Sequence, residues 1–193
     1  TMEAFAVDIG KPARRYQSRA ERRVHAWLKD REICELEAFG SLSGAAMLTK
    51  GCPLQRHKNG AQKVLNMRQD NSNVVAAGKR EIGGKLLWPF PIMSRRLSDK
   101  LDIIIQYEWE STDHIIGDPL SRYHKGGQKG KDKAIADFDT RLEIMRRRGL
   151  THAPRVDIGR ALQRHGEFDY AHAARLIDEW TWIKRHDSRR FIP

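Results

Sequence analysis

The stretch DKAIADFDTRLEIMRRRG, residues 132–149, carries the clearest structural pattern of the chain. Apolar side chains recur along it at spacings of three, four and three, namely Ile135, Phe138, Leu142 and Met145. This spacing places them on one face of an α-helix. Asp132 can cap the first turn, and Gly149 can end the last one beside three arginines that suit the negative end of the helix dipole. The stretch therefore predicts an amphipathic helix with one buried face.

A pair of shorter helices is predicted after Gly149. Pro154 can start the first helix and Gly166 can end it. Joined across Gly166, the two helices would form an antiparallel hairpin whose small residues let the backbones approach. The face that docks this hairpin on its surroundings is predicted to consist of four apolar side chains, Leu162, Phe168, Leu176 and Trp180.

The order of these features resembles a pentatricopeptide-type helical repeat. A basic helix end, MRRRGL at 145–150, is followed by a proline, a helix, a glycine turn and a second helix that ends in LIDEW at 176–180. The family usually has an acidic pair and a methionine at that last position. The resemblance covers residues 133–182, and its first helix is shorter and its second longer than in the family. The alternative is a three-helix packing motif at 134–182 without kinship to the family.

The resemblance implies a mitochondrial protein on the matrix side that either binds RNA or serves as a scaffold in a large assembly. Family members that read RNA by a base code stack many units, each reading one base. One and a half units cannot supply such a code, so docking is expected in its place. Because stacked units bury their apolar faces against one another, we expect the N-terminal helix or another protein to cover this hairpin.

The composition indicates a folded, strongly basic protein. Among 193 residues, 36 Lys and Arg face 25 Asp and Glu, a formal net charge of +11 that favours nucleic acid, anionic lipid or acidic proteins as neighbours. Five tryptophans supply apolar anchors, which argues against disorder throughout. No apolar run reaches the roughly 18 residues that a membrane span requires, so no transmembrane span is expected.

The N-terminal part predicts helix, irregular structure and one strand. Residues 1–17 are expected to form an extended basic arm. Ser18 and Glu21 form a capping box that predicts a helix from about 19 to 38, with Gly40 as its stop. Residues 101–109, LDIIIQYEW, are the best strand candidate. The two prolines of 86–91 exclude a central strand and suggest a segment that either wedges into a groove or covers a core. The predicted fold class is mainly α, with α+β possible.

The predicted domain order follows from these patterns. The arm at 1–17 precedes an N-terminal region at 18–121. Residues 122–133, RYHKGGQKGKDK, are rich in glycine and like charge and predict a flexible linker. The repeat-like module at 134–182 and a basic tail at 183–193 complete the chain.

No catalytic, metal or cofactor site can be recognised. The eight histidines are scattered without an acidic partner at ligand spacing. Cys34 and Cys52 could pair once or remain buried free thiols. The glycine–lysine stretch at 126–131 lacks the Ser or Thr of a phosphate-binding loop, because Asp132 stands there. We therefore predict that the chain is not an enzyme, and an RNA-processing nuclease is disfavoured for want of a carboxylate cluster.

Basic side chains gather in four clusters along the chain and are the candidate contacts for RNA or an acidic partner. They are Arg56, Lys58 and Lys63; Arg122, Lys125, Lys129, Lys131 and Lys133; Arg146, Arg147 and Arg148; and Lys184, Arg185, Arg189 and Arg190. Lysine and arginine displace the counterions that surround a phosphate backbone, and interleaved aromatics such as Trp182 can stack on exposed bases. Such contacts would position RNA without reading its sequence.

These observations predict a non-catalytic structural component of a large mitochondrial assembly, a ribonucleoprotein such as the mitochondrial ribosome. The hairpin would dock on other subunits while basic loops contact RNA phosphate. The alternative is an accessory scaffold subunit of a respiratory-chain or ATP-synthase complex, with peripheral membrane association through that complex. There the basic segments would meet acidic protein.

Overall fold

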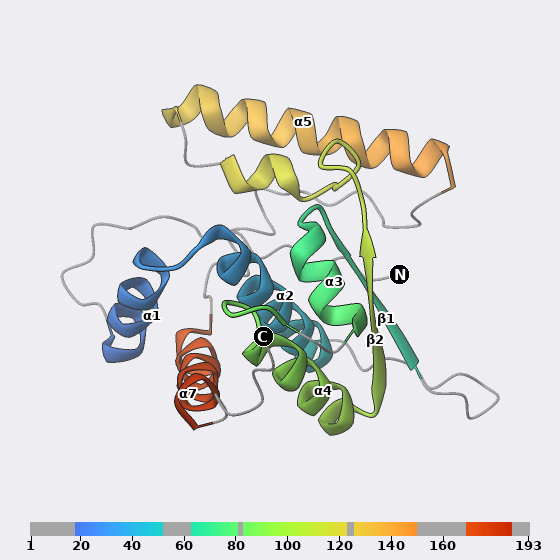
Figure 1. Cartoon of the computed structure of the whole chain (residues 1–193). Helices are drawn as coiled ribbons and strands as arrows, with labels where there is room; N and C mark the ends of the chain where they lie inside the picture. Colours follow the sequence, from blue (N-terminus) through green and yellow to red (C-terminus); the bar gives the residue numbers. More distant parts are fainter. Residues whose placement is uncertain (1–17, 52–62, 81–82, 123–125, 150–168, 187–193) are drawn as a thin grey trace. The chain divides into compact units, whose positions relative to one another are not determined.

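The computed structural model describes residues 18–51, 63–80, 83–122, 126–149 and 169–186, and these are mainly helical with one small sheet, which confirms the predicted fold class (Figure 1). The elements in chain order are α1 (Arg19–Lys29), α2 (Ile33–Gly51), β1 (Lys63–Gln69), α3 (Ser72–Arg80), α4 (Pro89–Leu101), β2 (Ile103–Trp109), the 3-10 helix η1 (Asp118–Arg122), α5 (Gly127–Arg147) and α7 (Tyr170–His186). None of the helices in these ranges is long and apolar enough to cross a membrane.

The chain divides into two compact units. The helix–sheet unit contains α1 to α4, both strands and α7, and its boundary with the second unit falls between Trp109 and Glu110. The helical unit contains η1 and α5. The predicted module at 134–182 therefore does not coincide with either unit, because α5 and α7 belong to different ones.

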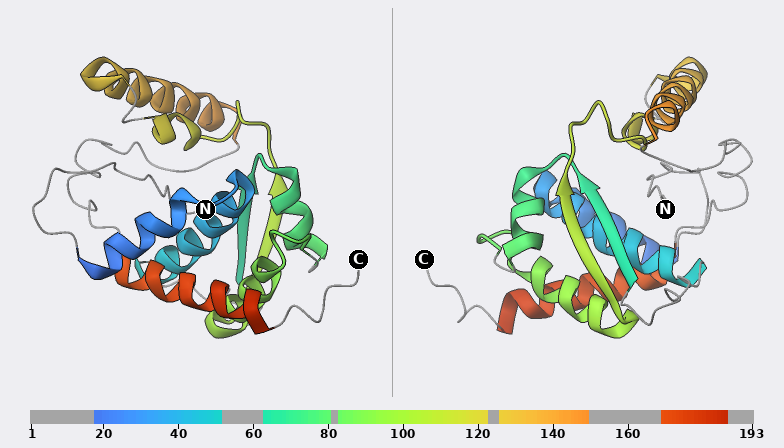
Figure 2. Two further views of the ribbon diagram at one scale, coloured as in Figure 1. Left: turned by 60° about the vertical axis from the view of Figure 1, so that its left-hand side comes forward. Right: turned by 90° about the vertical axis from the view of Figure 1, so that its right-hand side faces the viewer.

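A two-stranded parallel sheet forms one side of the helix–sheet unit (Figure 2). The strands run in register from Lys63 opposite Ile103 to Gln69 opposite Trp109. Parallel strands need a crossover connection, and α3 and α4 supply it. One face of the sheet packs against helices and buries Leu65, Ile103 and Tyr107, while Val64 and Ile104 are exposed on the opposite face. The strand predicted at 101–109 is confirmed from Ile103 onward as β2, because Leu101 still belongs to α4. β1 is the partner that it needed.

The main core lies between the sheet and the helices. Its largest fully buried side chains include Trp180 of α7, Phe90 of α4 and Leu42 of α2. α7 comes from a distant part of the sequence and packs against α1 and α4. The N-terminal helix thus covers the second helix of the predicted hairpin, whose first helix lies outside the described residues. The rings of Trp27 and Trp180 meet edge to face with centroids 6.0 Å apart. Aromatic pairs in this arrangement add to the free energy of simple burial.

The helix predicted at 19–38 is correct at its start and wrong at its end. The amide of Glu21 donates to Ser18 Oγ at 3.0 Å, which confirms the serine cap. Helix α1 ends at Lys29, with Asp30 as its C-cap. A second helix, α2, then runs past Gly40 to Gly51. A glycine inside a helix costs only about 1 kcal/mol relative to alanine. Burial of neighbouring α2 residues such as Phe39 and Leu42 offsets that cost.

The prolines at 89 and 91 begin a helix rather than a strand. Pro89 is the first residue of α4, where its fixed φ and missing amide carry no penalty. Pro89, Phe90 and Pro91 are all buried, as predicted for a segment that covers a core. The αL conformation of Asp102, with φ of 51°, then ends α4 and turns the chain into β2.

The linker predicted at 122–133 is wrong over most of its length. α5 begins at Gly127, directly after Gly126 with φ of 88°, so residues 127–133 form its first turns. Asp132 accepts a hydrogen bond from Gln128 Nε2 at 2.9 Å within the helix and does not cap it. The buried stripe of Ala134 and Phe138 extends the helix toward its N-terminus despite two glycines. The predicted end is confirmed, because Gly149 has φ of 66° just after the last turn.

The helical unit has its own small core. Ile116 and Leu120, before and within η1, pack against Phe138, Leu142 and Met145 of α5. The predicted stripe of α5 is thereby confirmed, with Ile135 partly buried beside it. The arm at 1–17, the first hairpin helix with Pro154 and Leu162, and Cys52 lie outside the described residues. Cys34 is a half-buried free thiol.

Candidate nucleic-acid interface

Five exposed cationic side chains lie near the two ends of α5. These are Lys129 and Lys133 near the N-terminus and Arg146, Arg147 and Arg148 at the C-terminus, called here the α5 cations. Lys129 and Arg147 are five helical turns apart, which at 1.5 Å per residue is about 27 Å. Asp137 and Asp139 are exposed in the middle of the helix. Positive charge is therefore concentrated at both ends of α5.

Among the residues that the structure describes, most of the α5 cations have no ion-pair partner. Arg147 Nε lies 3.0 Å from Glu143 Oε1, one turn away. In the described part of the chain Lys129, Lys133, Arg146 and Arg148 make no ion pair. The first turn of α5 holds Lys129 and no acidic residue. An arginine near the C-terminus is favoured by the helix dipole, whereas a lysine near the N-terminus is not.

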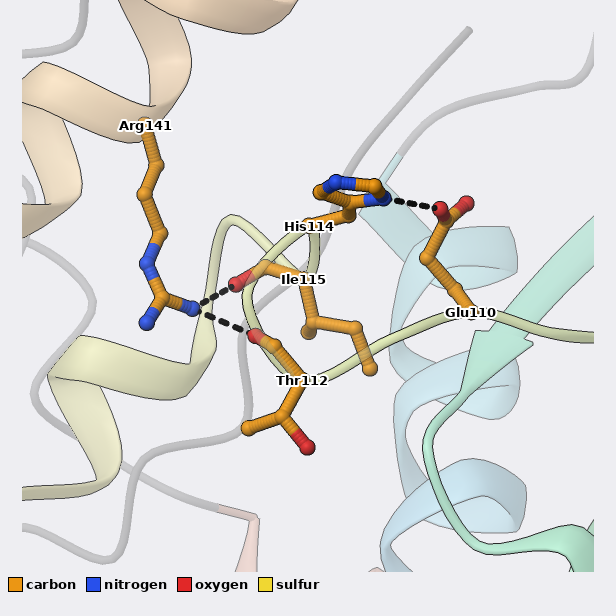
Figure 3. Close-up of polar contacts among 5 residues, drawn as sticks. All are labelled: Glu110, Thr112, His114, Ile115 and Arg141. Atoms are coloured by element: carbon orange, nitrogen blue, oxygen red, sulfur yellow. Dashed lines mark hydrogen bonds and ion pairs between the residues drawn. The ribbon is translucent and has the colours of Figure 1, made fainter.

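Arg141 of α5 has an internal role (Figure 3). Its Nη1 donates to the carbonyl oxygens of Thr112 at 2.6 Å and Ile115 at 2.9 Å, and it lies 3.5 Å from Asp118 Oδ2. The guanidinium is largely shielded from solvent and satisfies carbonyls that the irregular segment leaves open. Arg141 therefore holds the segment before η1 on α5.

His114 has an acidic partner, contrary to the expectation that none of the histidines does. Its Nδ1 lies 3.0 Å from Glu110 Oε1. Figure 3 marks this contact with a dashed line. Both side chains are partly exposed, and their turn is closed by the amide of His114 donating to Ser111 O at 2.8 Å. His25 also lies 3.8 Å from Glu21. No group of three potential metal ligands is found among the described residues.

The cations of α7 differ in their surroundings. Lys184 Nζ contacts Oε1 of Glu35, whose side chain is only 3 % exposed, so its charge is neutralised within the fold rather than offered to a partner. Arg185 in the same turn is exposed. Trp180, predicted on a docking face, is fully buried in the core, and Leu176 packs against that core. Trp180 is therefore part of the core of its own unit and is not available to another subunit, whereas Leu176 is only partly buried.

The remaining candidates are placed only in part. Lys63 is the first residue of β1 and Arg122 the last of η1. Lys131 is half-buried on α5, two residues before exposed Lys133. The other predicted contacts lie outside the described residues: Arg56, Lys58, Lys125, Leu162, Phe168, Arg189 and Arg190.

An exposed ridge of α7 presents an aromatic surface next to cations. Trp182 is 52 % exposed, and its ring stacks on that of His186 with centroids 4.8 Å apart and planes 19° from parallel. His186 Nδ1 lies 2.9 Å from the carbonyl oxygen of Trp182. Arg175 and Arg185 are exposed on the same helix.

A polar cluster that the sequence did not reveal lies where β1 ends. Glu37 of α2 meets the segment between β1 and α3, and its Oε2 is shielded from solvent without a hydrogen-bond partner among the described residues. Burial raises the pKa of Glu37, a hydrogen bond from Asn71 lowers it, and the nearby Asp70 raises it. Asn71 Oδ1 in turn accepts from the amides of Asn73 and Val74 at the start of α3. The contact depends on tertiary structure alone.

Comparison of the chain with protein-family models, with curated proteins and with solved structures finds no match.

Proposed function

We propose that this chain is a non-catalytic, basic subunit of a large ribonucleoprotein assembly, such as a mitochondrial ribosome, and that α5 contacts RNA phosphate. The observation that carries the proposal is that four α5 cations make no ion pair with any other described residue, namely Lys129, Lys133, Arg146 and Arg148. Cations that the fold does not neutralise repel one another. A polyanion relieves this repulsion and gains entropy from the counterions it releases.

The placement of these cations favours a backbone contact over sequence readout. They stand at the two ends of one rigid helix, with the acidic Asp137 and Asp139 between them. Such a helix can bridge two phosphate-rich segments or two turns of a folded RNA. The mitochondrial location follows from the resemblance to pentatricopeptide-type repeats and belongs to the proposal.

Salt titration of RNA binding tests the proposal. The four unpaired α5 cations are replaced together by glutamine, and a control variant carries the same change at four exposed cations of the other unit, Lys79, Arg80, Lys85 and Lys100. Each lost phosphate contact should reduce the slope of log affinity against log salt by roughly 0.7 to 0.9. We expect the α5 variant to lose two or more contacts and the control to keep its slope. No RNA affinity of the wild-type chain at low salt, or equal loss in both variants, would contradict the proposal.

A protein-docking subunit of a respiratory-chain or ATP-synthase complex is the second candidate. The observation that favours it is the outer face of the sheet, which no described helix of its unit covers and where Val64 and Ile104 lie opposite each other, 47 % and 39 % exposed. Parallel sheets are usually covered on both faces. Sedimentation of the endogenous protein with ribosomal particles supports the first candidate, and sedimentation with inner-membrane complexes supports the second.

A further inference from the structure

We infer that the exposed ridge of α7, formed by Arg175, Trp182, Arg185 and His186, binds unpaired bases of single-stranded RNA. The inference rests on the proposed function and names the form of RNA that the chain holds. It concerns a different unit from the α5 cations. The ridge offers a flat aromatic surface and positive charge together.

The indole of Trp182 is preset for stacking. Its contact with the imidazole of His186, nearly parallel and 4.8 Å away, holds the ring in one orientation. More than half of the side chain is nevertheless exposed to solvent. A base that stacks on the open part would extend the existing pair at little entropic cost, because the indole is already held.

The charged groups around Trp182 favour an anionic ligand. The two carboxylates one turn before it, Asp178 and Glu179, are each engaged by an arginine of a neighbouring helix. Asp178 pairs with Arg23 of α1, and Glu179 Oε1 lies 2.8 Å from Arg96 of α4. Arg175 and Arg185 make no ion pair within the described part of the chain. The acidic groups beside the indole are therefore neutralised, whereas Arg175 and Arg185 are not paired with any described acidic residue.

This combination fits single-stranded RNA better than the other polyanions. A duplex keeps its bases stacked inside, so it offers phosphates to Arg175 and Arg185 but no free base to Trp182. An acidic protein segment satisfies the arginines and gains little from an exposed ring. An unpaired strand satisfies both, because stacking tolerates any base and the backbone follows the cations.

Affinity measurements on the full chain test the inference with three probes: a short oligouridylate, duplex RNA of equal length and polyglutamate. Replacing Trp182→Ala should weaken oligouridylate binding by roughly tenfold, in line with the stacking of one base. Duplex and polyglutamate binding, and the salt slope for oligouridylate, should not change. Trp182→Phe keeps a ring and should retain most of the affinity. Trp109→Ala removes a tryptophan that is 59 % exposed elsewhere in the unit and should have no effect.

The affinities of Trp182→Ala and of the wild-type chain either support or overturn the inference. Unchanged oligouridylate affinity of Trp182→Ala overturns the inference, and so does an equal loss for all three probes. The proposed function survives both results if the wild-type chain binds RNA with a steep salt dependence. No RNA binding by the wild-type chain overturns both. Circular dichroism should show native folding of Trp182→Ala, since the side chain is outside the core.

Discussion

The hydroxyl of Tyr107 in β2 lies 2.8 Å from Oγ of Ser94 in α4, and both side chains are buried. The ring of Phe90 meets Tyr107 edge to face, with centroids 5.2 Å apart. This contact joins the sheet to the helix that leads into β2. The tyrosine hydroxyl is thereby held where water is excluded. Because ionisation there would bury a negative charge, the protonation state of Tyr107 is coupled to folding.

Because of Tyr107, the free energy of unfolding should fall at alkaline pH. Burial raises the pKa of Tyr107 from 10.0 to about 12, against a smaller lowering by the Ser94 hydrogen bond. The pKa of Tyr107 in the folded chain is above its value in the unfolded chain. Its contribution to the free energy of unfolding, roughly 2 to 3 kcal/mol, is therefore fully present below pH 10 and is lost as the pH rises to about 12. Urea unfolding should show wild type more stable than Tyr107→Phe at pH 8, with a difference that narrows between pH 10 and 12. A constant difference would contradict the assignment.

Gly78 of α3 allows the close approach of the same tyrosine. A Cβ at this position would lie 2.3 Å from Cδ2 of Tyr107, too close for any side chain. Gly78→Ala should therefore destabilise the chain by about 1 to 3 kcal/mol, despite alanine's better helix propensity. Gly40→Ala in α2 is the matched control, because nothing lies within 4 Å of its Cβ, and it should stabilise by about 0.5 to 1 kcal/mol. Thermal unfolding measures both, and a stable Gly78→Ala would refute the packing.

The ionised form of Glu37 lowers the stability of the folded chain. Burial and Asp70 raise its pKa above 4.5, so its contribution to stability is present below pH 4.5 and is lost as pH rises through the folded pKa. Glu37→Gln keeps an acceptor for Asn71 and removes the charge. We expect its melting temperature at pH 7 to exceed that of wild type by about 1 to 3 °C, since solvent screens part of the effect, and to equal it at pH 4. Glu32→Gln, at an exposed position, should change neither value.

Local chemistry predicted several elements of this fold. Ser18 caps α1 through a contact of three residues, and the β-branched run at 103–105 forms a strand wherever it finds a partner. β1 was missed because the alternation of Leu65 and Met67 with polar side chains is too short to indicate a strand, and its partner β2 lies forty residues later. A pairing so distant in sequence leaves no local signal.

The same limit explains the candidate sites. The exposed arginines at the C-terminal end of α5, Arg146 and Arg147, follow from the helical period of 132–149, which the sequence reveals. Lys129 falls in the predicted linker, so its place on α5 comes from the structure alone. The neutralisation of Lys184 cannot be predicted from a local pattern, because it depends on Glu35, a residue of another helix 149 positions away. Asn71 and Glu37 likewise meet only in the folded chain. Tertiary contacts therefore decide which charges remain for partners.

Arg141 should control the order of the segment before η1. Arg141→Met removes a charged donor from the carbonyls of Thr112 and Ile115, at a cost on the order of 2 kcal/mol. We expect faster amide hydrogen exchange at 110–120, measured by mass spectrometry. Arg147→Met, on the same helix but with its side chain 78 % exposed, should leave that exchange unchanged. Equal exchange in both variants would rule out the proposed role.

Lys184 and Glu35 should behave as an internal pair. Lys184→Met leaves a buried carboxylate without its nearest cation, with only Arg31 Nη1 at 3.8 Å, and should destabilise by about 2 to 4 kcal/mol at neutral pH. The double variant Glu35→Gln with Lys184→Met should recover part of this loss, because the uncompensated charge is gone. Arg185→Met in the same turn is exposed and should change stability by less than about 0.5 kcal/mol. Chemical denaturation of the three variants measures these differences, and equal effects of Lys184→Met and Arg185→Met would show that Lys184 is a surface cation like its neighbour.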